Sequence, residues 1–168
     1  GAVPYGPSKA ALETATEACS VALAVDGRVL ARHEIAPRRH AELVLPMCRD
    51  LIAEAGIARS NIDAVAVGRG PGAFTGVRLA IAIAQGLALA WDRPVVPVST
   101  LAALAHGAAP GADAICAAID ARMGEVYLGL YRRSGGELVA LADEQLVAPA
   151  AALLPDGAEC WCGIGTGF

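Results

Sequence analysis

The chain has few charged residues and no excess of positive charge. Only 18% of its 168 residues are Asp, Glu, Lys or Arg, and the formal net charge is −4. A protein that grips nucleic acid alone needs clustered Lys and Arg side chains against the phosphates. The densest basic point is the pair Arg38 and Arg39, which we interpret as solvated side chains ahead of a helix. Composition therefore argues against a chain that binds nucleic acid by itself.

Metal-binding and disulfide patterns are also missing. The three histidines have no carboxylate at a ligand spacing, and the five cysteines include no C-x-x-C pair. Cys160-x-Cys162 lacks the second pair that a zinc site would need. An odd number of cysteines, mostly in apolar segments, is typical of reduced thiols in a cytosolic core. We expect no metal and a cytoplasmic protein.

Long hydrophobic runs are absent from the sequence. The most apolar predicted helix, from Leu79 to Trp91, contains Gln85 and is shorter than the roughly 20 residues of a membrane span. The first twelve residues do not resemble a secretory signal. Because residues 1–11 are rich in glycine and proline, we interpret them as a poorly defined start outside the fold. We therefore expect no membrane partner.

The most informative stretch is a glycine-rich loop, Gly68–Arg78, with the sequence GRGPGAFTGVR. The apolar segment Ile62–Val67 before it predicts a buried parallel strand, and the apolar run after it predicts a helix that continues to Trp91. We expect Thr75 to be the N-cap of that helix. A strand, a glycine loop and a helix in this order bring the backbone close to another group.

Two interpretations of this loop stay open. Its glycines lack the Cβ atoms that would block a phosphate or a partner backbone, and N–H groups at a helix start favour an anion. Alternatively, Gly70 and Gly72 only let the chain turn sharply. Two familiar phosphate motifs are excluded, because Val77 stands where a P-loop has lysine and Ala73 interrupts the pattern G-x-G-x-x-G.

The sequence repeats one layout on either side of this loop. Leu12–Gly27 and Ala118–Tyr131 each predict a strand, a turn and a second strand, and each has an acidic residue near the first strand. Two such hairpins indicate two related lobes. Since 55% of the residues are hydrophobic, the chain can bury a sizeable core.

The segments Gly70–Arg78 and Asp120–Tyr127 together resemble the bacterial TsaB (YeaZ) family, and the likeness extends from about Leu12 to Phe168. The resemblance implies an α/β, actin-like and sugar-kinase-like (ASKHA) two-lobed fold with ribonuclease-H-like mixed sheets. We expect a first lobe over residues 12–105, with the glycine loop and the interface helices. The second lobe, residues 106–168, is then shorter than in the family and incomplete.

The same resemblance implies a non-catalytic partner role. Family members support the tRNA threonylcarbamoyl transferase TsaD, which forms threonylcarbamoyladenosine next to the anticodon, together with the ATPase TsaE. The metal-binding histidines of TsaD correspond here to Thr100 and Leu104, neither of which replaces an imidazole ligand. We therefore expect no catalytic residue, contact with tRNA only through the complex, and a homodimer as a possibility for the isolated chain.

The resemblance also implies a degenerate nucleotide site with weak ATP or ADP binding. Its residues are Glu13, Thr14, Gly70, Gly72, Asp120, Gly163 and Gly165. Glu13 stands where kinases of this fold place an acid near phosphate, but a structural carboxylate is an equal interpretation. Asp120 is ambiguous in the same way, because it could form an ion-paired cluster with Arg122 and Glu125. An active small-molecule kinase or ATPase is thus one alternative, and a glycoprotease-like peptidase is another. The peptidase has less support, since the serines lack a G-x-S-x-G elbow.

A second predicted helix, from His40 to Ala55, ends at Gly56 and carries two apolar stripes. One stripe contains Leu43, Met47 and Leu51, and its neighbour contains Val44, Cys48 and Ile52. Either both stripes belong to the core, or one of them meets another subunit. In the family this helix and the helix after the glycine loop form the subunit interface. The residues that carry this role are His40, Leu43, Met47, Leu51, Arg78, Ala82 and Gln85.

Overall fold

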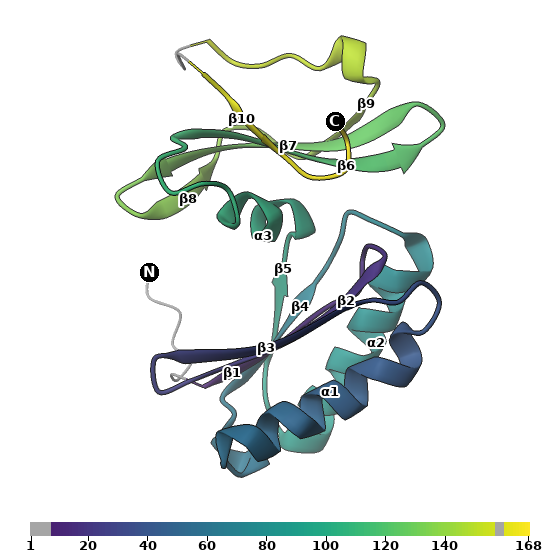
Figure 1. Ribbon diagram of the computed structural model, residues 1–168, viewed down its shortest axis with the longest axis vertical. Helices are drawn as coiled ribbons and strands as arrows, with labels where there is room; N and C mark the ends of the chain where they lie inside the picture. The colour runs from purple at the N-terminus through teal and green to yellow at the C-terminus, as the bar shows by residue number, and fades with distance from the viewer. Residues whose placement is uncertain (1–7, 157–159) are drawn as a thin grey trace. The chain divides into compact units, whose positions relative to one another are not determined.

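The computed structural model describes residues 8–156 and 160–168, which form two compact units (Figure 1). Unit 1 contains the described residues up to Arg69 together with Ala73–Val98, and unit 2 contains Gly70–Gly72 and Ser99–Phe168. The elements of unit 1 are β1 (Lys9–Glu13), β2 (Ala18–Val25), β3 (Arg28–Ile35), α1 (His40–Ala55), η1 (Arg59–Asn61), β4 (Ala64–Gly68), α2 (Phe74–Trp91) and β5 (Val95–Val98). Those of unit 2 are α3 (Thr100–His106), β6 (Ala114–Arg122), β7 (Glu125–Ser134), β8 (Glu137–Ala140), β9 (Gln145–Val147), η2 (Pro149–Ala151) and β10 (Cys162–Ile164).

Unit 1 is built on a mixed sheet with the strand order β3-β2-β1-β4-β5. β1, β2 and β3 form an antiparallel meander, whereas β4 and β5 run parallel to β1. Along β2, buried and half-buried residues alternate, as the period of a strand with one core face requires. The glycine loop therefore follows a central parallel strand, as the sequence predicted.

Helices α1 and α2 pack on the same face of this sheet and share one core cluster with it (Figure 1). α1 buries the larger side chains Val44, Cys48 and Leu51, while α2 buries only alanines: Ala80, Ala84 and Ala88. α1 ends at Gly56, which has the left-handed conformation expected of a helix C-cap. The small residues of α2 let that helix approach the sheet closely.

Unit 2 repeats part of this topology. Its sheet has the order β10-β6-β7-β8, in which β6, β7 and β8 are antiparallel and β10 runs parallel to β6. The order β8-β7-β6-β10 thus corresponds to β3-β2-β1-β4 of unit 1. This correspondence confirms that the two predicted hairpins begin related lobes.

Two predicted boundaries are wrong. β1 begins at Lys9, inside the segment 1–11 that we had placed outside the fold, and residues 1–7 lie outside the described residues. Ser8 and Ala10 are buried because β1 is the central strand of the sheet. The first lobe does not reach residue 105, since Leu101 and Ala105 pack in the core of unit 2.

Two details of the predicted helices are also wrong. The helix after the glycine loop starts at Phe74, and its N-cap is Ala73 rather than Thr75. The helix is also longer than the predicted segment Leu79–Trp91, since it spans 18 residues. Among the helices in the described part of the chain, it is the one that is long and apolar enough to cross a membrane, by length and composition alone. A single helix of this kind is weak evidence for a membrane span, because a core helix passes the same test.

Candidate functional site

The carboxylate of Glu13 lies against the backbone at the start of the glycine loop. Oε1 of Glu13 accepts a hydrogen bond of 2.7 Å from the backbone N–H of Ala15. A Cβ atom on Gly68 would stand 2.0 Å from Oε2 of Glu13, so this position has room for the carboxylate only because it is glycine. These contacts favour the structural interpretation of Glu13 over a role beside metal and phosphate.

The next residue, Thr14, joins the first hairpin to the helix start. Its side chain is fully buried, and Oγ1 donates a 2.7 Å hydrogen bond to the carbonyl oxygen of Gly76. A Cβ atom on Gly76 would stand 2.1 Å from the carbonyl oxygen of Thr14. The backbone N–H of Ala73, the helix N-cap, donates to the carbonyl oxygen of Ala15 over 2.7 Å. Protein groups thus occupy this junction.

Gly70 and Gly72, the two glycines predicted to shape the loop, differ in backbone conformation. Gly70 has a φ of +90°, which a residue with a side chain rarely adopts, and its carbonyl oxygen accepts a 2.9 Å bond from the N–H of Thr100. Gly72 does not have a positive φ. A backbone conformation that favours glycine is therefore present at Gly70 and not at Gly72.

Asp120, at the end of β6, pairs with Arg122. Its Oδ1 accepts a 2.8 Å bond from the N–H of Arg122, and its Oδ2 lies 3.5 Å from the Arg122 guanidinium. The N–H of Asp120 donates to Oγ1 of Thr166 over 3.3 Å. This arrangement favours the ion-paired interpretation of Asp120. Among the described residues, the ion pairs that are found do not include Glu125, the third member we had proposed.

The glycines near the C-terminal end pack against other parts of unit 2. A Cβ atom on Gly165 would stand 2.0 Å from the carbonyl oxygen of Ala118, and Gly165 has a φ of +117°. A Cβ atom on Gly163 would approach the Phe168 ring to 3.0 Å. The N–H of Gly167 donates to the same Ala118 carbonyl over 3.1 Å. Close packing on Ala118 of β6 therefore accounts for glycine at position 165, and packing on the Phe168 ring limits the side chain at position 163.

The two positions that the resemblance matched to metal ligands of TsaD are apolar or buried here. Thr100 is the first residue of α3 and is buried, while Leu104 packs in the core of unit 2. Within residues 8–156 and 160–168, no group of three or more His, Cys, Asp or Glu side chains is arranged to hold a metal ion. The hydroxyl of Thr100 and the aliphatic side chain of Leu104 do not supply the imidazole nitrogen of a histidine ligand.

The predicted interface residues fall into three groups by exposure. Arg78, Ala82 and Gln85 are exposed and lie on one face of α2, at spacings of four and three residues. His40, Leu43 and Met47 of α1 are half-buried, and Leu51 is 1% exposed. Leu51 is a core residue, so its assignment to an interface is wrong.

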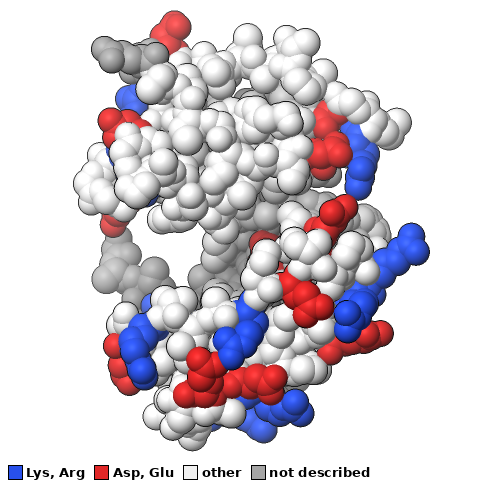
Figure 2. Space-filling view, viewed as in Figure 1, with Lys and Arg blue, Asp and Glu red and all other residues white. Residues whose placement is uncertain are grey.

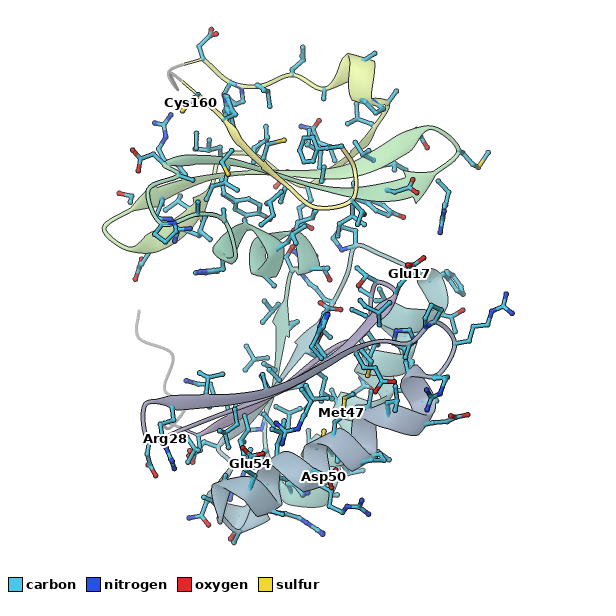
Figure 3. All side chains as sticks on the ribbon, in the orientation of Figure 1. Glu17, Arg28, Met47, Asp50, Glu54 and Cys160 are labelled. Carbon is cyan, nitrogen blue, oxygen red and sulfur yellow. The ribbon has the colours of Figure 1, made fainter. Side chains whose placement is uncertain are left out.

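Met47 belongs to the edge of the core. In Figure 3 it lies between α1 and the sheet, and its Sδ is 4.0 Å from Sγ of Cys19. Its side chain packs against the core cluster of unit 1. A substitution at Met47 would therefore disturb packing as well as any surface.

Charge does not mark a nucleic-acid surface on the face drawn in Figure 2. There, lysine and arginine side chains of unit 1 alternate with aspartate and glutamate. The ion pairs Arg39–Glu34, Arg39–Glu42 and Arg49–Asp50, at 3.4 to 3.5 Å, are of this mixed kind. Intermingled charges of both signs give no basic stripe for phosphates.

A mixed sheet of order β3-β2-β1-β4-β5, followed by a unit that repeats its first strands, defines an actin-like and sugar-kinase-like protein. The ROK hexokinase of Thermus thermophilus has this fold, with a TM-score of 0.50 and 21% identity over 91% of this chain and 55% of that one.

Closer relatives identify the family. The profile described as "TsaD: tRNA N6-adenosine threonylcarbamoyltransferase" matches residues 32–160. The chain is 46% identical to the tRNA threonylcarbamoyladenosine biosynthesis protein TsaB of Escherichia coli, over 94% of this chain and 71% of that protein. YeaZ from Pseudomonas aeruginosa superposes with a TM-score of 0.92 and 52% identity, over 96% of this chain and 77% of that one. The chain belongs to the TsaB (YeaZ) family, which confirms the resemblance drawn from the sequence.

Proposed function

We propose that this chain is the non-catalytic partner of the tRNA threonylcarbamoyl transferase TsaD and is required for threonylcarbamoyladenosine formation next to the anticodon. It acts in the cytoplasm, where the ATPase TsaE completes the assembly and tRNA is reached through the complex. The relatives named for this biosynthesis support the proposal, as do the positions Thr100 and Leu104, which lack the ligands of the transferase metal.

The exposed face of α2 is the observation that carries the partner role. Phe74 and Leu89, one near each end of the helix, are 72% and 86% exposed. Between them, Arg78, Ala82 and Gln85 are also exposed, so a helix with high mean hydropathy turns one long face outward. Apolar area left in water in this way favours burial against another protein.

The outward face of α2 is shaped for close contact. The Arg78 guanidinium carbon lies 3.4 Å from the centroid of the Phe74 ring, and its NH1 donates to the Phe74 carbonyl oxygen over 3.3 Å. Beyond this pair, Ala82 and Gly86 have small side chains or none, so a partner helix can approach the backbone of α2 closely. The face fits TsaD or, when the chain is alone, a second copy of the same chain.

We further propose that the chain needs no cofactor of its own and binds ATP or ADP weakly at most. The groups predicted to meet a nucleotide have partners within the protein: Glu13 with Ala15, Thr14 with Gly76, and Asp120 with Arg122. No observation favours the kinase, the ATPase or the peptidase as a second function.

Reconstitution tests this proposal. The purified chain, TsaD and TsaE of one organism are combined with tRNA, ATP and threonylcarbamoyl adenylate as the group donor, and modification is measured with each protein omitted in turn. We expect modification to stop when this chain is omitted, although the chain alone modifies no tRNA and releases no phosphate from ATP. Full modification without the chain, or steady ATP turnover by the chain alone, would contradict the proposal.

A further inference from the structure

Among the described residues, three pairs of neighbouring strands are joined by two-residue turns, and one of these turns has an unusual sequence. The turns are Asp26-Gly27 between β2 and β3, Met123-Gly124 between β6 and β7, and Gly135-Gly136 between β7 and β8. All six residues have positive φ, with values from 48° to 85°. Such turns strongly prefer Asp-Gly, Asn-Gly or Gly-Gly, because the left-handed region disfavours most side chains. Only the turn at Met123 departs from this preference.

The departure is not explained by packing. The Met123 side chain is 99% exposed, so it makes no packing contact that stabilises the folded chain and that an asparagine would lack. The residue before it, Arg122, also has a left-handed φ, of 70°. Two consecutive non-glycine residues are thus held in a disfavoured conformation at the tip of one hairpin.

The base of this tip is braced. A β-bulge lies between Asp120 and Arg122, and bulges redirect the side chains that follow them. Asp120 holds the bulge through the bond from the Arg122 N–H and the 3.5 Å ion pair, and its own N–H is bonded to Thr166. The hairpin therefore projects one apolar side chain on an ordered support.

We propose that Met123 is a binding residue that inserts into an apolar pocket of TsaD. This inference rests on the proposed function, since it adds a second contact to the partnership with the transferase. A single flexible thioether beside a paired arginine suits a protein pocket. A membrane would require several apolar side chains together, and RNA would require unpaired basic or aromatic groups.

Three variants test the inference in the full chain, with purified TsaD as the binding probe. Met123→Asn keeps the turn and removes the apolar side chain, so we expect the melting temperature to rise by about 2–4 °C and association with TsaD to weaken about tenfold or more. Met123→Leu keeps an apolar side chain of similar size, and we expect binding within about threefold of the wild type. Asp26→Met is the matched control, which should lower the melting temperature and leave binding unchanged.

Each result decides the inference. Weaker binding by the more stable Met123→Asn protein, with Met123→Leu and Asp26→Met binding normally, supports it. Normal binding by Met123→Asn would overturn it, as would a melting temperature that does not rise, because the conformational cost would then be absent. If the wild type itself does not bind TsaD, the proposed function fails. If the wild type binds and the variants bind equally, only the role of Met123 fails.

Discussion

The hairpins that begin the two sheets end in different surroundings. In unit 1 the turn after β1 is enclosed: Thr14 is fully buried and bonded to Gly76, and the Ala15 carbonyl accepts the N–H of Ala73. In unit 2 the turn after β6 is open: Met123 is 99% exposed, and the Arg122 side chain is 79% exposed. The two units share their strand topology, but the turn after β1 is enclosed and the turn after β6 is exposed.

This difference shows how a fold can be kept while its loops change roles. The acidic residue and the glycine loop of unit 1, which were predicted to meet a nucleotide phosphate, close on one another here. Two glycines, Gly68 and Gly76, make that closure possible by leaving room for Glu13 and Thr14. The equivalent turn of unit 2 remains available to a partner.

The largest expected effect is the difference in cysteine reactivity between the enclosed interior of unit 1 and an exposed position in unit 2. Burial, followed by the nearby Cys19 thiol, raises the pKa of Cys48 to about 12, and burial raises the pKa of both Cys19 and Cys116. A raised pKa keeps the thiol protonated, and the thiolate is the form that reacts. We therefore expect Cys48 to be alkylated about a thousandfold more slowly than an ordinary thiol at pH 8. Cys160, which is exposed and labelled in Figure 3, should react first.

Peptide mass spectrometry after timed alkylation of the folded chain measures these rates, and the unfolded chain in denaturant is the control. Fast labelling of Cys48 in the folded chain would show that the interior of unit 1 opens readily.

Two glycines of α2 give the next largest effect. Gly76→Ala would place a methyl group 2.1 Å from the Thr14 carbonyl oxygen, so we expect a loss of about 3 kcal/mol in the free energy of unfolding. Gly86→Ala is the matched control on the same helix, because nothing lies within 4 Å of its Cβ position. That change should gain about 0.5–1 kcal/mol through helix propensity. Urea unfolding of both variants distinguishes the positions, and equal stabilities would disprove the close approach.

Two threonines give a smaller effect and compare the hairpins directly. Thr14→Val leaves the Gly76 carbonyl without its buried donor, and we expect a loss of about 1–2 kcal/mol. Thr166→Val removes an exposed acceptor of the Asp120 N–H, and water can replace it, so we expect a loss below about 0.5 kcal/mol. Thermal melting of both variants measures the difference. A larger loss at Thr166 would reverse the comparison between the two turns.

Local signals made much of the fold predictable from the sequence. The repeated layout of a strand, a turn and a second strand predicted both hairpins, and Gly56 correctly predicted the end of α1. The roles of Gly68 and Gly76 were missed because their close neighbours, Glu13 and Thr14, are more than fifty residues away in the chain. A local sequence pattern cannot predict that a distant residue will lie where the side chain of a glycine position would be.

Helix geometry explains the error at Leu51. With about 100° per residue, Leu51 lies about 20° from Val44 around the helix axis and about 80° from Leu43. Leu51 therefore shares the buried stripe with Val44, although a spacing of four residues also connects it to Leu43 through Met47. The start of α2 was missed for a different reason, since the tertiary bond from Ala73 to Ala15 fixes it, with no side-chain cap.

Association through the outer face of α2 is the central claim, and one substitution tests it most directly. Ala82→Asp places a charge on this face, where the position is exposed, so the isolated chain should lose less than about 1 kcal/mol of stability. Ala142→Asp, at an exposed position in unit 2, is the matched control. Sedimentation of each variant with TsaD, together with its melting curve, is the measurement. We predict that Ala82→Asp stays folded but loses the complex, whereas Ala142→Asp retains it. A folded Ala82→Asp protein that binds TsaD as tightly as the wild type would contradict the account.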